Sequence, residues 1–108
     1  MQPLIGIPPC LDERGRWRAD RTYQYIDVAY ARAVEQAGGI PLYLPLQADA
    51  EALATRIGGL LLPGGDDFPP EAPCPEGVRF DPVPAAQLAF DRRLLAAALA
   101  RGLPVLAI

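Results

Sequence analysis

The chain has 108 residues, of which 51% are apolar, and carries a formal net charge of −3 at pH 7. This length suits a single small domain, and a chain of this size buries somewhat over ~60% of its unfolded surface when it folds. Its ten basic residues are all arginines and form no basic tract, and no apolar run approaches the ~20 residues of a membrane span, so we expect neither a nucleic-acid nor a membrane partner.

The residue types exclude several kinds of catalytic site. Histidine does not occur, so the chain contains no complete Ser-His-Asp or Cys-His machinery. The two cysteines, Cys10 and Cys74, lack metal-ligand spacing and are interpreted as free thiols. We therefore expect no metal and no other cofactor. The first residues contain no basic, signal-type segment, which favours a cytoplasmic protein.

The first predicted element is a short buried strand over residues 3–7. Its β-branched residues favour a strand, and Pro8 and Pro9 end it. Residues 10–20 are mostly charged and show no periodicity. This segment is predicted to be a surface loop over the strand ends.

A helix is predicted next, over residues 22–37. Its apolar side chains recur at intervals of three and four, which is the helical period. Asp20 or Thr22 is expected to cap the start of this helix, and the glycine at Gly38 to end it. Residues 40–44 then form the second predicted strand, which a proline inside it should keep short.

A second helix and a third strand follow in close succession. The helix is predicted over residues 50–57, with Asp49 as its cap. The strand is the apolar run 59–62, which Pro63 ends. An uninterrupted apolar run of this length is typical of a buried parallel strand, because both of its faces are packed.

The last part of the chain begins with a proline-rich stretch, residues 68–81, which is predicted to be an extended loop. Asp81 is expected to cap a third helix that tolerates the following prolines in its first turn. Gly102 ends this helix, and residues 103–108 form a fourth buried strand. Strands and helices thus alternate along the whole chain, which predicts an α/β fold with a parallel sheet and right-handed crossovers.

The turn after the third predicted strand is the main candidate for a functional site. Gly64 and Gly65 come where the strand ends, and ligands of open α/β sheets bind at that edge. Their backbone N–H groups could stabilise an oxyanion, or the two glycines could simply form a tight turn. Asp66 and Asp67 could bind an amine or a metal, but we favour a role in starting the loop.

Two other kinds of phosphate-related site fit the sequence poorly. A response-regulator receiver needs a lysine and acidic residues after its first strand, whereas this chain has no lysine and has two prolines there. A phosphate-binding loop needs the G-x-x-x-x-G-K pattern followed by a helix, and the turn after Pro63 has neither.

Four segments together resemble the γ-glutamyl-γ-aminobutyrate hydrolases, a family of the class I glutamine amidotransferase-like superfamily. They occur in the family's order and span nearly the whole chain. The segments are Leu4-Ile-Gly-Ile-Pro8, the segment from Tyr30 to Pro45 with its Ala-Gly-Gly-Ile-Pro-Leu-Tyr-Leu-Pro, Gly59-Leu-Leu-Leu-Pro-Gly-Gly-Asp-Asp67 and Ala98-Leu-Ala-Arg-Gly-Leu-Pro-Val-Leu-Ala-Ile108.

This resemblance implies a flavodoxin-like three-layer α/β sandwich with a parallel sheet, of which residues 1–108 form the amino-terminal part, truncated after the fourth strand. It also implies cleavage of a γ-glutamyl amide through a cysteine thioester. The family's cysteine nucleophile follows the strand that matches residues 103–108, and its His-Glu pair comes later. What carries over to this chain is the oxyanion turn, at Gly64 and Gly65.

Two functions therefore remain open. The first is the amino-terminal segment of a γ-glutamyl amide hydrolase that is inactive alone, with Asp66 and Asp67 near a small γ-glutamyl substrate. The second is a non-catalytic flavodoxin-like binding or interaction module. In either case the strand over residues 103–108 lacks a covering neighbour. We therefore expect the chain alone to pair with a second copy through this strand, to aggregate, or to be the amino-terminal portion of a longer protein.

Overall fold

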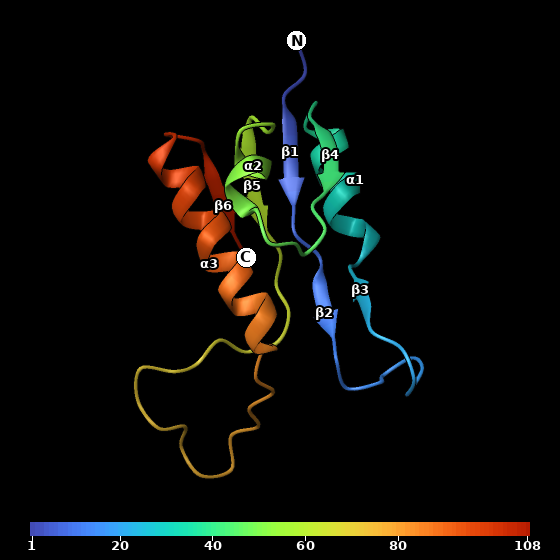
Figure 1. The fold of residues 1–108 in the computed structure, drawn as a ribbon, viewed down its shortest axis with the longest axis vertical. Coiled ribbons are helices and arrows are strands. Elements are labelled where there is room, and N and C mark those ends of the chain that lie inside the picture. Colours follow the sequence, from blue (N-terminus) through green and yellow to red (C-terminus); the bar gives the residue numbers. More distant parts are fainter.

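The computed structural model describes residues 1–108 and contains one parallel sheet of four strands (Figure 1). The strand order is β4-β1-β5-β6. The bounds are Leu4–Ile7 for β1, Ile40–Tyr43 for β4, Gly59–Leu62 for β5 and Val105–Ala107 for β6. Helices flank the sheet, so the predicted α/β architecture is confirmed and is consistent with a flavodoxin-like fold.

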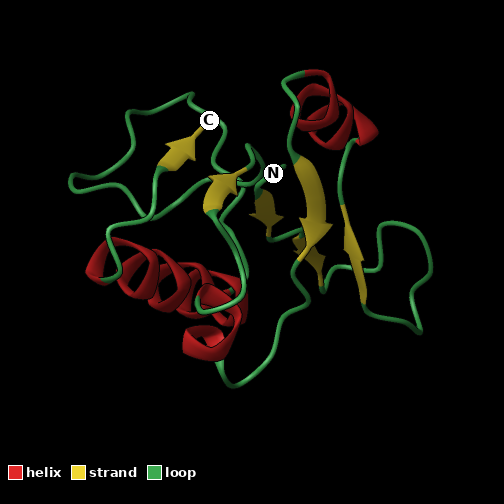
Figure 2. Cartoon of the chain, turned by 90° about the horizontal axis from the view of Figure 1, so that it is seen from above, coloured by secondary structure: helices red, strands yellow, loops and turns green.

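The helices lie on opposite faces of the sheet (Figure 2). Helix α1 (Val28–Gln36) covers one face, while α2 (Ala50–Ala54) and α3 (Ala85–Ala100) pack together on the other. Successive residues of β5 divide between these two cores, because side chains alternate along a strand. Leu60 belongs to the core under α2 and α3, and Leu61 belongs to the core under α1.

The position of β4 at one edge of the sheet explains the proline within it. The N–H groups of Ile40 and Leu44 donate to the carbonyls of Pro3 and Ile7. Position 41 therefore faces away from β1, and Pro41 costs the sheet no hydrogen bond.

An antiparallel hairpin replaces the surface loop that was predicted over residues 10–20. Strand β2 (Cys10–Asp12) pairs with β3 (Tyr23–Tyr25), and all three residues of β2 are buried. The hairpin lies beyond the carboxyl end of β1 (Figure 1). The loop prediction was wrong for residues 10–12, because contacts with the rest of the chain, rather than local periodicity, bury this short strand. It was right for residues 13–20, which form no helix or strand and are mostly exposed.

The first helix is shorter than its apolar spacing predicted. It begins after Asp27, whose carboxylate accepts the N–H of Ala29 at 2.8 Å, so the capping roles expected of Asp20 and Thr22 were wrong. Tyr23 matched the helical period by chance, because it lies in β3. The helix ends as predicted at Gly38, which has a φ of +91°.

The third helix also begins later than expected. Its N-cap is Pro84, which has no side-chain hydrogen bond to offer, and Asp81 lies outside the helix. The buried residues of α3 are Gln87, Phe90, Leu94 and Ala98. Leu99 lies on the other side of the helix and is 60% exposed.

Strand β6 lies at the other edge of the sheet rather than inside it. Its residue Leu106 is 59% exposed and the following Ile108 is 67% exposed, so the expectation of a buried strand was wrong. An apolar depression of about 320 Å³ lies beside it, lined by Ile5, Val34, Leu60, Leu61, Val105 and Leu106 among others. Pairing of this edge with a second copy of the chain stays a prediction.

Candidate functional site

The segments that follow β1 and β5 meet at the carboxyl edge of the sheet. Prolines 8 and 9 lead from β1 to Cys10, whose thiol donates a long hydrogen bond of 3.7 Å to the carbonyl oxygen of Gly64. The end of β6 lies at the same place, because the N–H of Ile108 donates to the carbonyl oxygen of Leu62 at 3.0 Å. Three strand ends therefore surround the glycine turn.

The backbone N–H of Gly64 has a partner within the chain. It donates to the hydroxyl oxygen of Tyr30, in α1, at 3.1 Å. A Cβ atom at position 64 would lie 3.3 Å from that hydroxyl and 3.7 Å from the carbonyl oxygen of Ile108. A side chain at position 64 would therefore contact both the Tyr30 hydroxyl and the end of β6.

The N–H of Gly65 makes no hydrogen bond within residues 1–108, and the residue is exposed. Glycine is required here for space and not for backbone conformation, since Gly65 does not have a positive φ. A Cβ atom at this position would lie only 2.7 Å from the Sγ of Cys10. The Gly65 N–H is thus a free backbone donor at the predicted ligand-binding edge.

Cys10 is 5% exposed and unsuited to act as a nucleophile. Burial is the main cause that raises the pKa of its thiol, and the charges of Asp66 and Asp91 raise it further. The thiol therefore stays protonated at neutral pH. Cys74, in contrast, is exposed, and both cysteines are free, as predicted.

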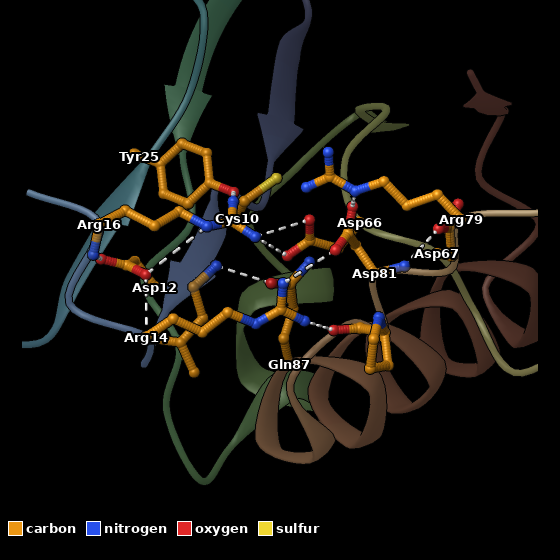
Figure 3. Close-up of polar contacts among 12 residues, drawn as sticks. Cys10, Asp12, Arg14, Arg16, Tyr25, Asp66, Asp67, Arg79, Asp81 and Gln87 are labelled. Atoms are coloured by element: carbon orange, nitrogen blue, oxygen red, sulfur yellow. Dashed lines mark hydrogen bonds and ion pairs between the residues drawn. The ribbon is translucent and has the colours of Figure 1, made fainter.

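Asp66 is engaged in an ion pair with the β2–β3 hairpin (Figure 3). The Nη2 atom of Arg16 lies 2.9 Å and 3.0 Å from its two carboxylate oxygens, and Nη1 donates to the Tyr25 hydroxyl at 2.7 Å. The Arg16 backbone N–H in turn donates to the buried carboxylate of Asp12 at 2.9 Å. Asp66 therefore lies at the site, beside Gly65, with its charge balanced by Arg16.

Asp67 closes the base of the proline-rich loop instead of facing the turn. Its N–H donates to the Asp81 carbonyl at 2.7 Å, and its carboxylate accepts the N–H of Asp81 at 2.9 Å. The Asp67 carbonyl accepts the N–H of Val83 at 2.9 Å. Its groups thus agree with the loop-starting role that the sequence favoured.

A buried polar chain connects α3 to the hairpin. The Oε1 atom of Gln87 accepts the N–H of Leu11 at 2.6 Å, and its Nε2 atom donates to Asp91 at 3.4 Å. Burial raises the pKa of Asp91 to about 6, against the smaller opposite effect of the Gln87 hydrogen bond. The second carboxylate oxygen of Asp91 is buried without a partner.

The sequence gives little or no indication that three residues belong to this site. Gln87 is a polar residue on the buried side of a helix, and this mismatch could have marked it. Tyr30 fits the apolar period of its helix, and nothing in the sequence indicates that its hydroxyl reaches the glycine turn. Arg16 lay in a charged segment among other arginines, and only the fold distinguishes it from them.

The structure also bears on membranes and metals. None of the three helices is long and apolar enough to cross a bilayer. No group of three or more cysteine and carboxylate side chains is arranged so that it could hold a metal ion.

Comparisons with known proteins place the chain in a family. The model of the peptidase C26 family matches residues 3–108. A glutamine amidotransferase-like protein of Rickettsia prowazekii is 36% identical over 69 residues. That alignment covers 61% of this chain and 25% of the relative, so the chain spans about a quarter of the length of the curated protein that it matches.

Proposed function

Because the chain belongs to the peptidase C26 family, as the match over residues 3–108 shows, we propose that it is the amino-terminal part of a cysteine-dependent hydrolase of γ-glutamyl amides. The family and the Rickettsia relative support a hydrolase-type, glutamine amidotransferase-like domain. The finer substrate class, and γ-glutamyl-γ-aminobutyrate in particular, rests on the resemblance of the four sequence segments.

One observation carries the proposal: the free, exposed N–H of Gly65 lies on a turn that contacts the end of β6. The resemblance puts the family's cysteine directly after the strand that matches residues 103–108. Gly64 and Ile108 are neighbours across the sheet. A cysteine that follows Ile108 would therefore be attached beside the turn that offers the oxyanion donor.

The proposed reaction assigns this chain a stabilising role. The cysteine thiolate attacks the γ-carbonyl carbon, a C–S bond forms, and the carbonyl π electrons move to the oxygen. The Gly65 N–H donates to that oxyanion, an interaction worth ~3 kcal/mol in the transition state. Collapse of the intermediate releases the amine, which takes a proton from the family's histidine, and water then hydrolyses the thioester.

A non-catalytic binding module is the second candidate, and the thiols of this chain favour it. Residues 1–108 contain no histidine, and Cys10 is buried with a raised pKa. Under the first proposal these 108 residues alone are inactive, and under the second no larger form of the protein would be active either.

The test compares two forms of the protein. One is expressed from its natural coding sequence and the other comprises residues 1–108 alone. Each is incubated with a γ-glutamyl chloromethyl ketone, which alkylates a reactive thiolate with loss of chloride, and with γ-glutamyl p-nitroanilide. Both carry Cys74→Ser, because the exposed Cys74 thiol could otherwise be alkylated by the reagent even if no active site were present.

We expect turnover of the anilide and a single adduct in the natural form, with the adduct on a cysteine other than Cys10. The form that comprises residues 1–108 should give neither. If the natural form also gives neither turnover nor an adduct, the hydrolase proposal fails and the binding module is the better description.

Two further properties belong to this proposal. The two free cysteines fit a reducing compartment, and we place the activity in the cytoplasm. The exposed edge of β6 is expected to pair with another strand, and association of the 108-residue form, measured by sedimentation, tests this.

A further inference from the structure

We propose that the hydroxyl group of Tyr30 is a further oxyanion donor of the site, acting beside the N–H of Gly65. The inference rests on the proposed hydrolase function and assigns a catalytic role to a residue of α1. It starts from the contact at 3.1 Å in which the Tyr30 hydroxyl accepts the N–H of Gly64.

That contact leaves the hydroxyl proton of Tyr30 available. The oxygen uses a lone pair to accept from Gly64, and no group within residues 1–108 accepts the proton of the hydroxyl. A tyrosine hydroxyl both donates and accepts, so the same oxygen can bind Gly64 and donate to a ligand. The bond from Gly64 also polarises the hydroxyl and strengthens its donation.

The position of the hydroxyl suits the proposed reaction. A Cβ atom built on Gly64 would lie 3.3 Å from the Tyr30 hydroxyl and 3.7 Å from the carbonyl oxygen of Ile108, so both oxygens lie close to this glycine. The Tyr30 hydroxyl and the end of β6 thus both lie within contact distance of Gly64, the residue before the free N–H of Gly65. A carbonyl oxygen placed there would meet two donors from different elements of the fold.

The ring of Tyr30 is held in place by the core. It packs against the cluster of Ile7, Val34 and Leu61 under α1. A donor that is fixed before the reaction needs no reorganisation when charge develops, and this is the condition under which an oxyanion donor is effective. No proton leaves Tyr30 in the step: its O–H bond stays intact and its hydrogen bond shortens as the carbonyl oxygen becomes negative.

The test is a kinetic comparison of Tyr30→Phe with the unaltered protein in its natural form, using γ-glutamyl p-nitroanilide. Tyr43→Phe is the matched control, since Tyr43 is 48% exposed and its hydroxyl makes no hydrogen bond within the chain. We expect Tyr30→Phe to lower kcat about 10²-fold with little change in KM, because the hydrogen bond strengthens only in the transition state. Tyr43→Phe should leave both constants unchanged.

A second variant tests the same hydroxyl in case Tyr30→Phe does not fold. A fluorinated tyrosine at position 30 keeps the shape of the side chain but makes the hydroxyl more acidic. Once that hydroxyl is deprotonated it cannot donate, so kcat should fall at a lower pH than in the unaltered protein. A residue that only supports the fold would not move this pH profile.

The outcomes separate this inference from the proposed function. If the unaltered protein hydrolyses the anilide but Tyr30→Phe has an unchanged or raised kcat, Tyr30 only occupies the Gly64 N–H and the inference fails while the function stands. If the fluorinated variant has the ordinary pH profile, the inference fails in the same way. If the unaltered protein has no activity and forms no adduct, both proposals fail together.

Discussion

Replacement of Gly65 by alanine gives the sharpest test of the geometry at the glycine turn. The new Cβ atom would lie 2.7 Å from the Sγ of Cys10. This is roughly 1 Å closer than the ~3.5–4.0 Å at which nonbonded carbon atoms pack, and sulfur is larger than carbon. Cys10 is 5% exposed and has little room to move, so we expect Gly65→Ala to lower the free energy of unfolding by about 1–3 kcal/mol.

We expect this loss of stability to depend on a single atom, the Sγ of Cys10. Cys10→Ala removes the Sγ, and Gly65 has no positive φ that would strain an alanine. In the Cys10→Ala background, Gly65→Ala should therefore be neutral, or should stabilise the fold by up to ~1 kcal/mol through the lower entropy of the unfolded chain. The two substitutions should show a coupling energy of about 1–3 kcal/mol.

The assay is urea unfolding of the unaltered protein, the two single variants and the double variant. Gly58→Ala serves as a control, because its nearest contact would be an ordinary 3.4 Å to Pro3. If Gly65→Ala costs the same with and without the Cys10 Sγ, the close approach of the two segments is not the reason for the glycine, and the described geometry of the turn is wrong.

Three further expectations follow from the polar groups around the turn. Burial raises the pKa of Asp91 to about 6 from an ordinary 3.8, so the folded state holds a proton that the unfolded state releases. The free energy of unfolding should fall as the pH rises from about 4 to about 6, and Asp91→Asn should flatten that part of a pH series of urea midpoints. Gln87→Leu leaves the buried N–H of Leu11 without an acceptor and should cost about 1–3 kcal/mol, measured by urea unfolding at pH 7. Asp67→Ala removes the acceptor of the Asp81 N–H and should speed hydrogen exchange of that amide, with a loss of about 1 kcal/mol in stability.

Much of the fold could be predicted because it depends on local features of the chain. The apolar run of β5, the stop of α1 at Gly38 and the cap of α2 at Asp49 each act over a few residues. Alternation of such elements leaves few arrangements other than a parallel sheet with helices on its faces. The place of the candidate site follows as well, since the Gly64-Gly65 turn comes at the end of a central strand.

The β2–β3 hairpin could not be predicted from local features of the sequence. Residues 10–12 have no periodicity because only three of them pair, and their burial depends on Gln87, 76 positions away from Leu11. The helical spacing over residues 22–37 was misleading at its start, since Tyr23 pairs with Asp12 of the neighbouring strand instead of joining the helix. A pairing of this kind is decided by the fold around it.

For the glycine turn, too, the sequence determined some features and the tertiary structure determined others. The sequence alone determined that a strand ends in two glycines and two aspartates, and therefore where a ligand could bind. Only the tertiary structure decided that Asp66 pairs with Arg16, that Asp67 closes a loop and that Tyr30 reaches Gly64. The physical reason is that backbone preference acts between neighbours in the chain, whereas hydrogen bonds and ion pairs join groups that only folding brings within 3 to 4 Å of one another.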